Sequence, residues 1–112
     1  MAEISGYTVI FYQGETPHIR FNVVDSDNNP YDLTGGAAVL TYRKGTGAVV
    51  NVPGVITGTT VDVSFTHATT QMMKDMYVFQ LMCRNASGEI VMCREGFIDV
   101  KASQDPDAVN TL

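Results

Sequence analysis

The sequence lacks tryptophan, has only two cysteines, and is poor in basic residues and in long apolar runs. Its 112 residues include only 7 lysines and arginines against 12 aspartates and glutamates, so the formal net charge is −5. A nucleic-acid backbone is bound by a basic surface that neutralises several phosphates, which argues against nucleic acid as a partner. No apolar run approaches the roughly 18 residues of a membrane-spanning helix, so we expect no membrane partner either.

The start of the chain carries no sign of export. Residues 1–6 contain neither the basic segment nor the apolar core of a secretory signal peptide. We therefore expect a protein that is made and kept in a cytoplasm, or released without such a signal. The low charge, 17% against 45% hydrophobic residues, indicates a folded domain rather than a disordered chain.

Short alternating runs of apolar and polar residues, separated by turn residues, predict an all-β chain. About seven short strands with turns at this spacing are typical of a β-sandwich. A break at Pro53 and Gly54 separates two of the runs, and Gly96 suggests a bulge in the last one. The expected strands are Tyr7–Tyr12, Pro17–Val24, Ala37–Arg43, Ala48–Val52, Val55–Thr57, Thr60–Thr66, Met76–Arg84 and Glu89–Val100.

One segment, about residues 68–76, departs from this alternation. It holds good helix formers after Thr69 and Thr70, two candidate N-cap residues, and predicts a single helical turn. Tyr77 follows at a strand start, where sandwich proteins place a corner tyrosine that bonds to upstream backbone; an ordinary core tyrosine is the alternative. The methionines of the turn, among them Met72 and Met76, either fill the core or pack on another subunit.

The two cysteines lie on the last two expected strands. Pairing Arg84 with Glu89 across the turn at residues 85–88 would place Gln80 opposite Cys93 and Ile90 opposite Cys83. Side chains alternate along a strand, so this register puts the thiols on different faces of the sheet. We therefore expect two buried free thiols, as suits a reducing compartment.

We divide the chain into a β-sandwich, residues 1–101, and an extended C-terminal tail, residues 102–112. The tail is polar and contains Pro106. Alone in water such a segment should be mobile, and a partner subunit would be needed to order it.

Several short motifs, in order along the chain, resemble the N-terminal domains of phage baseplate upper proteins and related small virion proteins. The resemblance covers roughly residues 8–101 and centres on the corner Asp32-Leu-Thr-Gly35. It implies an immunoglobulin-like antiparallel β-sandwich that mediates virion assembly. The motifs are Gly14–Phe21, Asp25–Gly36, Tyr42–Gly45, Tyr77–Leu81, Gly88 and Gly96–Val100.

Two departures from the family pattern refine this expectation. Asp75 and Met76 stand where such domains often have glycine before the strand tyrosine. Family members usually carry long C-terminal stalks, whereas this sequence stops soon after the sandwich. We therefore expect a stand-alone head decoration, neck or tail/baseplate adaptor protein, assembled in the host bacterial cytoplasm and located in the virion.

The expected partners are other virion proteins of the capsid, neck or tail, and further copies of the chain in a symmetric oligomer or lattice. The expected first strand, Tyr7–Tyr12, is apolar on both faces and suits an exposed edge that pairs with another chain. Two other hypotheses remain: a binding module of a bacterial surface or secretion apparatus, and a small carbohydrate-binding sandwich.

No catalytic, cofactor-binding or metal-binding set stands out, so we expect no enzyme activity and no cofactor. The spacing of Asp25–Asn29 opens a calcium loop, but Pro30 and Gly36 stand where that loop needs glycine and glutamate. We expect a turn that caps its own backbone there, with a looser cation site as the alternative. His18 and His67 are expected to be surface polar residues, and no zinc-ligand spacing includes them.

Overall fold

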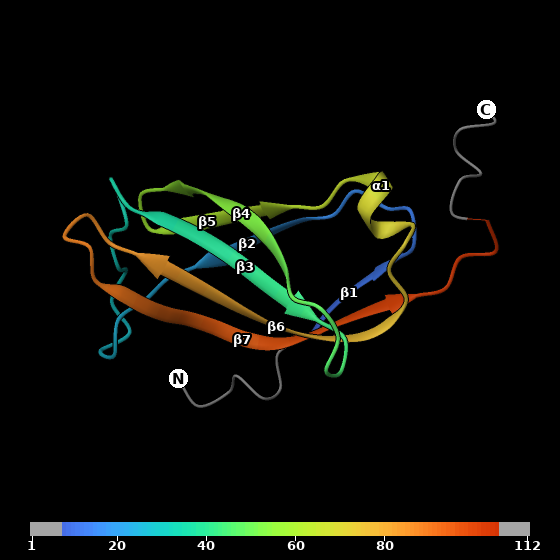
Figure 1. Ribbon diagram of the computed structural model, residues 1–112. Helices are drawn as coiled ribbons and strands as arrows, with labels where there is room; N and C mark the ends of the chain where they lie inside the picture. Colours follow the sequence, from blue (N-terminus) through green and yellow to red (C-terminus); the bar gives the residue numbers. More distant parts are fainter. Residues whose placement is uncertain (1–7, 106–112) are drawn as a thin grey trace.

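The alternation of apolar and polar residues in the sequence produces seven strands and one short helix among residues 8–105, the part of the chain that the computed structural model describes (Figure 1). The chain is all-β, as expected. The elements are β1 (Thr8–Tyr12), β2 (His18–Asn22), β3 (Ala37–Arg43), β4 (Val50–Thr57), β5 (Thr60–Ser64), α1 (His67–Thr70), β6 (Asp75–Arg84) and β7 (Ile90–Lys101).

The strands form one curled sheet in the order β1-β7-β6-β3-β4-β5-β2. All pairs are antiparallel except β1 with β7, which is parallel. The first part of β4, residues 50–54, pairs with β3, and residues 55–57 pair with β5. Figure 1 shows β4 curving from beside β3 to beside β5, so the two ends of the sheet enclose a common interior.

The core fills this interior with one face of every strand. Leu40, Leu81, Ile98 and Val61 are fully buried, and the ring centroids of Phe21 on β2 and Phe79 on β6 lie 5.9 Å apart. A β2 ring in contact with a β6 ring places the two ends of the curled sheet face to face. Aromatic rings at this separation contribute both buried area and a favourable ring contact.

The expected break at Pro53 and Gly54 was wrong, because β4 runs through both residues. Proline lacks an N–H group and is tolerated in a strand only where that loss costs no ladder bond. Among the described strands, residues 50–54 pair with β3 on one side and with none on the other, so proline is tolerated at position 53. At Gly54, β4 bends toward β5. Glycine is needed there because a Cβ at this position would lie 2.6 Å from a methyl carbon of Val61 on β5.

The corner at Asp32–Gly36 is built by its own side chains. The Asp32 carboxylate accepts hydrogen bonds from the backbone N–H and the hydroxyl of Thr34, at 3.0 and 2.6 Å. Leu33 is fully buried, and the N–H of Gly36 donates to the Leu33 carbonyl. Gly35 has a φ of 83°, a backbone conformation that favours glycine. These contacts give a physical reason for each residue of this motif.

The helical turn is shorter and earlier than the expected 68–76. Thr66, not Thr69 or Thr70, is the N-cap, and its hydroxyl accepts the N–H of Thr69. The helix ends at Thr70, whose buried hydroxyl donates to the Glu15 carbonyl at 2.6 Å. The good helix formers that follow instead lead into β6, with Met73 buried in the core.

The expected register of the last hairpin was also wrong by one residue. The N–H of Asn85 donates to the Glu89 carbonyl, so Glu89 belongs to the loop and Arg84 pairs with Ile90. The register shifts between Leu81 and Met82, where Cys93 is the extra residue on β7. The bulge is therefore at Cys93, while Gly96, where we expected it, pairs regularly with Phe79.

Tyr77 is the corner tyrosine that the sequence offered as one of two alternatives. Its hydroxyl accepts the backbone N–H of Lys74 at 3.0 Å, and its ring meets Tyr42 edge-on at 5.5 Å. We expect Tyr77→Phe to lower the free energy of unfolding by about 1 kcal/mol, because the ring contact remains and one hydrogen bond is lost. Urea denaturation measures this, and an unchanged midpoint would contradict it.

The ends of the predicted strands and of the tail fall partly outside the described residues. Tyr7 and residues 106–112 are among those not described, while β7 extends one residue beyond the expected end, to Lys101. Ser103 of the predicted tail donates its backbone N–H to the side-chain oxygen of Gln13 at 3.0 Å. Within residues 8–105, no helix is long and apolar enough to cross a membrane.

Candidate functional site

The outer face of β1, β7, β6 and β3 carries the most distinctive surface of the molecule. Strand side chains alternate between the two faces, and Tyr77, Phe79 and Leu81 all point to the core side. Met76, Val78 and Gln80 therefore project from the opposite side. Register places residues of neighbouring strands in rows across this face, such as Ile10, Asp99 and Met76, or Phe97, Val78 and Arg43.

Large apolar side chains gather at one end of this face. The exposed fractions are 60% for Ile10, 48% for Met76, 43% for Val78 and 53% for Val49, and Phe97 is half-buried among them. We call these residues the outer apolar patch: Ile10, Val49, Met76, Val78 and Phe97. Neighbouring exposed apolar residues ringed by polar groups are characteristic of protein interaction sites.

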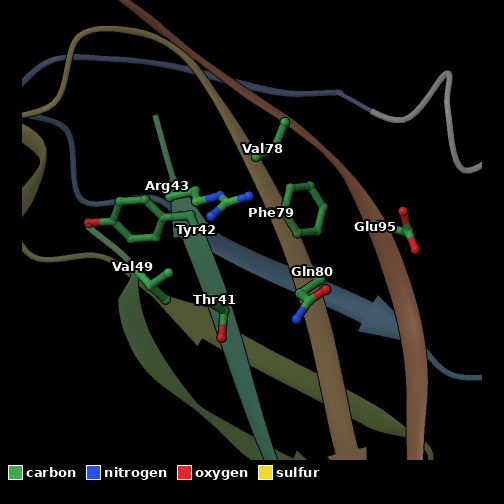
Figure 2. Close-up of a pocket in the computed structure, with 8 residues that line it drawn as sticks. All are labelled: Thr41, Tyr42, Arg43, Val49, Val78, Phe79, Gln80 and Glu95. Atoms are coloured by element: carbon green, nitrogen blue, oxygen red, sulfur yellow. The ribbon is translucent and has the colours of Figure 1, made fainter. Parts of the chain in front are cut away.

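A hollow of about 340 Å³ lies within this face, as Figure 2 shows. Val49 and Val78 are among the apolar residues that line it, and Figure 2 shows Gln80 on β6 and Glu95 on β7 in the same lining. The hydroxyl of Thr41, also in its lining, donates to the side-chain oxygen of Asn51 at 2.9 Å. The lining groups thus offer short-range packing and a few hydrogen bonds, which suits contact with another polypeptide.

Charged pairs border the patch. Lys101 lies 2.9 Å from the carboxylate of Asp99, which raises the pKa of the exposed lysine through that hydrogen bond and charge. At the start of β6, next to Met76, Lys44 lies 3.5 Å from Asp75 and over the ring of Tyr77. These exposed pairs contribute little to stability, and they set the charge pattern that a partner would have to match.

The edges of the sheet differ in how they are protected. The N–H of Gln13 donates to Lys101 on β7, so the alternate residues Ile10 and Tyr12 direct their backbone groups away from β7. The Tyr12 N–H bonds to the Glu15 carboxylate and the Tyr12 carbonyl to the Glu15 N–H. The expectation of β1 as an edge strand is confirmed, and Glu15 occupies one end of that edge.

The opposite edge strand, β2, carries a charged side chain that forms an ion pair with β5. Arg20 and Asp62 form a two-point ion pair with nitrogen–oxygen distances of 2.8 and 3.3 Å. This hydrogen bond lowers the pKa of Asp62, and the hydrogen bond from the Thr34 hydroxyl lowers that of Asp32. Charged side chains on an edge strand discourage unwanted strand pairing.

Comparison with models of known protein families and with curated protein sequences finds no match for this chain. The interpretation of the outer face therefore depends on its own geometry and on the sequence motifs.

In the turn at Asp25–Asn29, the Asp25 carboxylate accepts hydrogen bonds from the backbone of the turn itself, as expected. The side-chain oxygen Oδ1 of Asp25 accepts the N–H groups of Asp27 and Asn29 at 2.9 and 3.0 Å. Asn28 takes a φ of 68°, which asparagine tolerates better than most residues. Among the described residues, no group of three or more histidine, cysteine, aspartate or glutamate side chains could hold a metal ion.

The two histidines have different surroundings. His18 is exposed, as expected, with Nδ1 at 2.7 Å from the Ser64 hydroxyl. His67, also expected at the surface, is half-buried at the lining of a surface hollow, with Nδ1 at 2.7 Å from the Gly14 carbonyl. That contact ties α1 to the turn after β1, a structural role that a lone histidine after a strand does not reveal in the sequence.

The sequence pointed to part of the outer apolar patch. Met76 and the first strand were singled out as contact candidates, and Met72 is indeed exposed while Met73 fills the core. Val49, Val78 and Phe97 were missed. The signal for Val78 was present, because a strand whose odd-numbered residues face the core presents its even-numbered ones to solvent.

The lowered pKa values of Asp62 and Asp32 give a test of these surface contacts. A carboxyl whose pKa is lowered by folding adds stability above its unfolded-state pKa, and that stability is lost as the pH falls through the folded-state value. We expect NMR titration to place both groups below the ordinary 3.8. Arg20→Gln should move Asp62 back toward that value and leave Asp32 unchanged; equal shifts in both would contradict the assignment.

Proposed function

We propose that the curled sheet is an immunoglobulin-like sandwich. Two groups of strands support this. The neighbours β3, β6 and β7 correspond to strands C, F and G of that fold, and β2, β5 and the second part of β4 correspond to B, E and D. In this scheme β4 changes sheets at Gly54, and β1 is the first strand, parallel to the last.

Two core features add support. Tyr77 stands at the start of the strand equivalent to F, and its hydroxyl bonds to backbone three residues upstream. In antibody domains the cysteine of the inter-sheet disulfide follows that tyrosine by two residues. Here the position is Phe79, which meets Phe21 of the strand equivalent to B. The aromatic pair thus joins the two sheets where the disulfide would.

We propose that the protein acts in bacteriophage virion assembly through protein–protein contacts, as a head decoration, neck or tail/baseplate adaptor. The observation that carries the contact role is the outer apolar patch, whose exposed side chains project beside the open edge of β1. The virion setting depends on the sequence motifs that resemble small virion proteins. In this role the patch packs on another virion subunit, and the charged pairs around it fix the orientation.

The test places one charge within the patch. We expect Val78→Glu to reduce incorporation into phage particles, and any self-association, by at least about tenfold, since burying an unpaired carboxylate costs more than 1.4 kcal/mol. Quantitative mass spectrometry of particles and sedimentation velocity of the purified chain measure the two effects.

The matched control is Ile90→Glu. Ile90 is 67% exposed on the same outer face, at the far end of β7 and more than about 20 Å from Phe97 along the strand. This variant should assemble like the unmodified chain. Equal incorporation of the Val78→Glu and unmodified chains would overturn the proposed contact surface, and absence of the unmodified chain from particles would overturn the virion role.

A further inference from the structure

The pairing of β6 with β7 places the two cysteines on the same side of the sheet. Cys83 is opposite Val91, and Cys93 is the inserted residue two positions further along β7. Cys83 belongs to the buried core, and Cys93 packs against that core from the neighbouring strand. The longer turn causes this, because pairing Arg84 with Glu89, as the sequence predicted, would have put the thiols on opposite faces.

The two thiols are free and interact with each other. A hydrogen bond between them lowers the pKa of Cys93 and, together with burial, raises that of Cys83. The thiolate is the reactive form of cysteine, and the lower pKa of Cys93 favours its thiolate. Cys93 is therefore the nucleophile of the pair, and Cys83 is the second thiol that can react with it.

Cys93 is more exposed to solvent than Cys83. Cys93 is half-buried and lines a surface hollow of about 230 Å³, together with Val24, Tyr31 and Val91. Cys83 is only 2% exposed. A small oxidant can therefore approach Cys93 from the hollow, while Cys83 is shielded from it and is in position to resolve the product.

We propose that Cys83 and Cys93 form a redox modification site that a hydroperoxide converts into an intramolecular disulfide between β6 and β7. In the first step the Cys93 thiolate attacks a peroxide oxygen, the O–O bond breaks, and protonation releases water or an alcohol and leaves a sulfenic acid. In the second step the Cys83 sulfur attacks the Cys93 sulfur, the S–O bond breaks, and water leaves. Two thiols lose two electrons in total, and the peroxide gains them.

The disulfide would close the hairpin loop from Cys83 to Cys93 and restrict the unfolded chain. The folded protein should therefore become more resistant to heat after oxidation, by roughly 10 °C in midpoint. Thiol reductants reverse the change. The site is independent of the proposed assembly role, because it lies on the core side of the sheet and away from the outer apolar patch.

The experiment treats the folded, reduced full-length chain with hydrogen peroxide, blocks remaining thiols with N-ethylmaleimide, and measures the intact mass without reductant. The expected product is a monomer that has lost two hydrogens, takes up no maleimide, and yields one peptide pair joined through Cys83 and Cys93. Dithiothreitol should restore the original mass. Disulfide-linked dimers, or a folded monomer in which both thiols survive and take up maleimide, would overturn the proposal.

Two variants separate the roles of the thiols. Cys83→Ala removes the resolving thiol, so the sulfenic acid at Cys93 should accumulate and be trapped by dimedone. Cys93→Ala should leave the shielded Cys83 unreacted under the same exposure. Dimedone labelling of Cys83 in preference to Cys93 would overturn the order of reaction, and the result on the unmodified chain decides the disulfide itself even where a variant fails to fold.

Discussion

Replacing Phe79 with alanine should lower the free energy of unfolding by about 3–5 kcal/mol, the usual cost of removing a buried aromatic side chain. Phe79 is 4% exposed, and its ring contacts Phe21 across the interior of the curled sheet. The loss would include both the transfer of the ring from water and the cavity left between β6 and β2. Most domains have only about 5–15 kcal/mol in total, so the variant should be close to unfolding at 37 °C.

Urea denaturation followed by circular dichroism measures this loss, with Val78→Ala as the matched control. Val78 immediately precedes Phe79 on the same strand but projects outward. Its truncation should therefore change the free energy of unfolding by less than about 0.5 kcal/mol. Similar losses in the two variants would contradict the assignment of inward and outward faces along β6.

Gly36→Ala should lower the free energy of unfolding by about 3 kcal/mol, at the upper end of the usual cost of overpacking. A Cβ at Gly36 would lie 1.9 Å from the carbonyl oxygen of Arg84, which belongs to the backbone of β6 and cannot rotate away. The start of β3 would have to move away from β6, and the pairing of Ala37 with Arg84 would be lost first.

Gly58→Ala is the control for the general cost of replacing a turn glycine. Gly58 has a φ of 62°, and among residues 8–105 no heavy atom beyond Gly58 and its two chain neighbours lies within 4 Å of the position that its Cβ would take. We therefore expect a cost of about 1 kcal/mol from backbone strain alone. Thermal unfolding of the two variants compares them directly, and a Gly36→Ala variant as stable as Gly58→Ala would contradict the close approach of β3 and β6.

The regular strands were the part of the fold that the sequence predicted best. In β3 the alternation predicted both ends correctly, because Gly36 and Lys44 flank a run in which every second residue is apolar. The outward side chains of β6 follow from the same period. Period-2 patterns report directly on burial, which is the dominant contribution to the formation of these strands.

The errors occurred where tertiary contacts override local preference. Pro53 is a strand breaker by local chemistry, yet it is accepted where β4 has a partner on one side only. Gln71 to Lys74 are good helix formers, yet the helix ends at Thr70 and Met73 of this segment is buried in the core. The register of β6 with β7 is shifted once by the extra residue in the loop at Asn85 and again by the bulge at Cys93, and local propensity reveals neither.

The candidate site was only partly visible for a related reason. The sequence does not distinguish an exposed valine or methionine from a buried one. The face of the sheet on which such a residue lies is known only once the strand register is fixed. Met76 was noticed because methionines cluster near it, whereas Phe97 and Val49 become part of one surface only through the pairing of β7 with β6 and the curl of the chain before β4.

The copy number of this chain in purified phage particles is a direct test of the proposed role as an assembly subunit. Quantitative mass spectrometry would measure the ratio of this chain to the major capsid protein. An assembly subunit should be present at a fixed ratio in every preparation, in the hundreds of copies for a head decoration protein or between a few and a few dozen for a neck or tail adaptor. Absence of the chain from particles whose other structural proteins are all detected would contradict it.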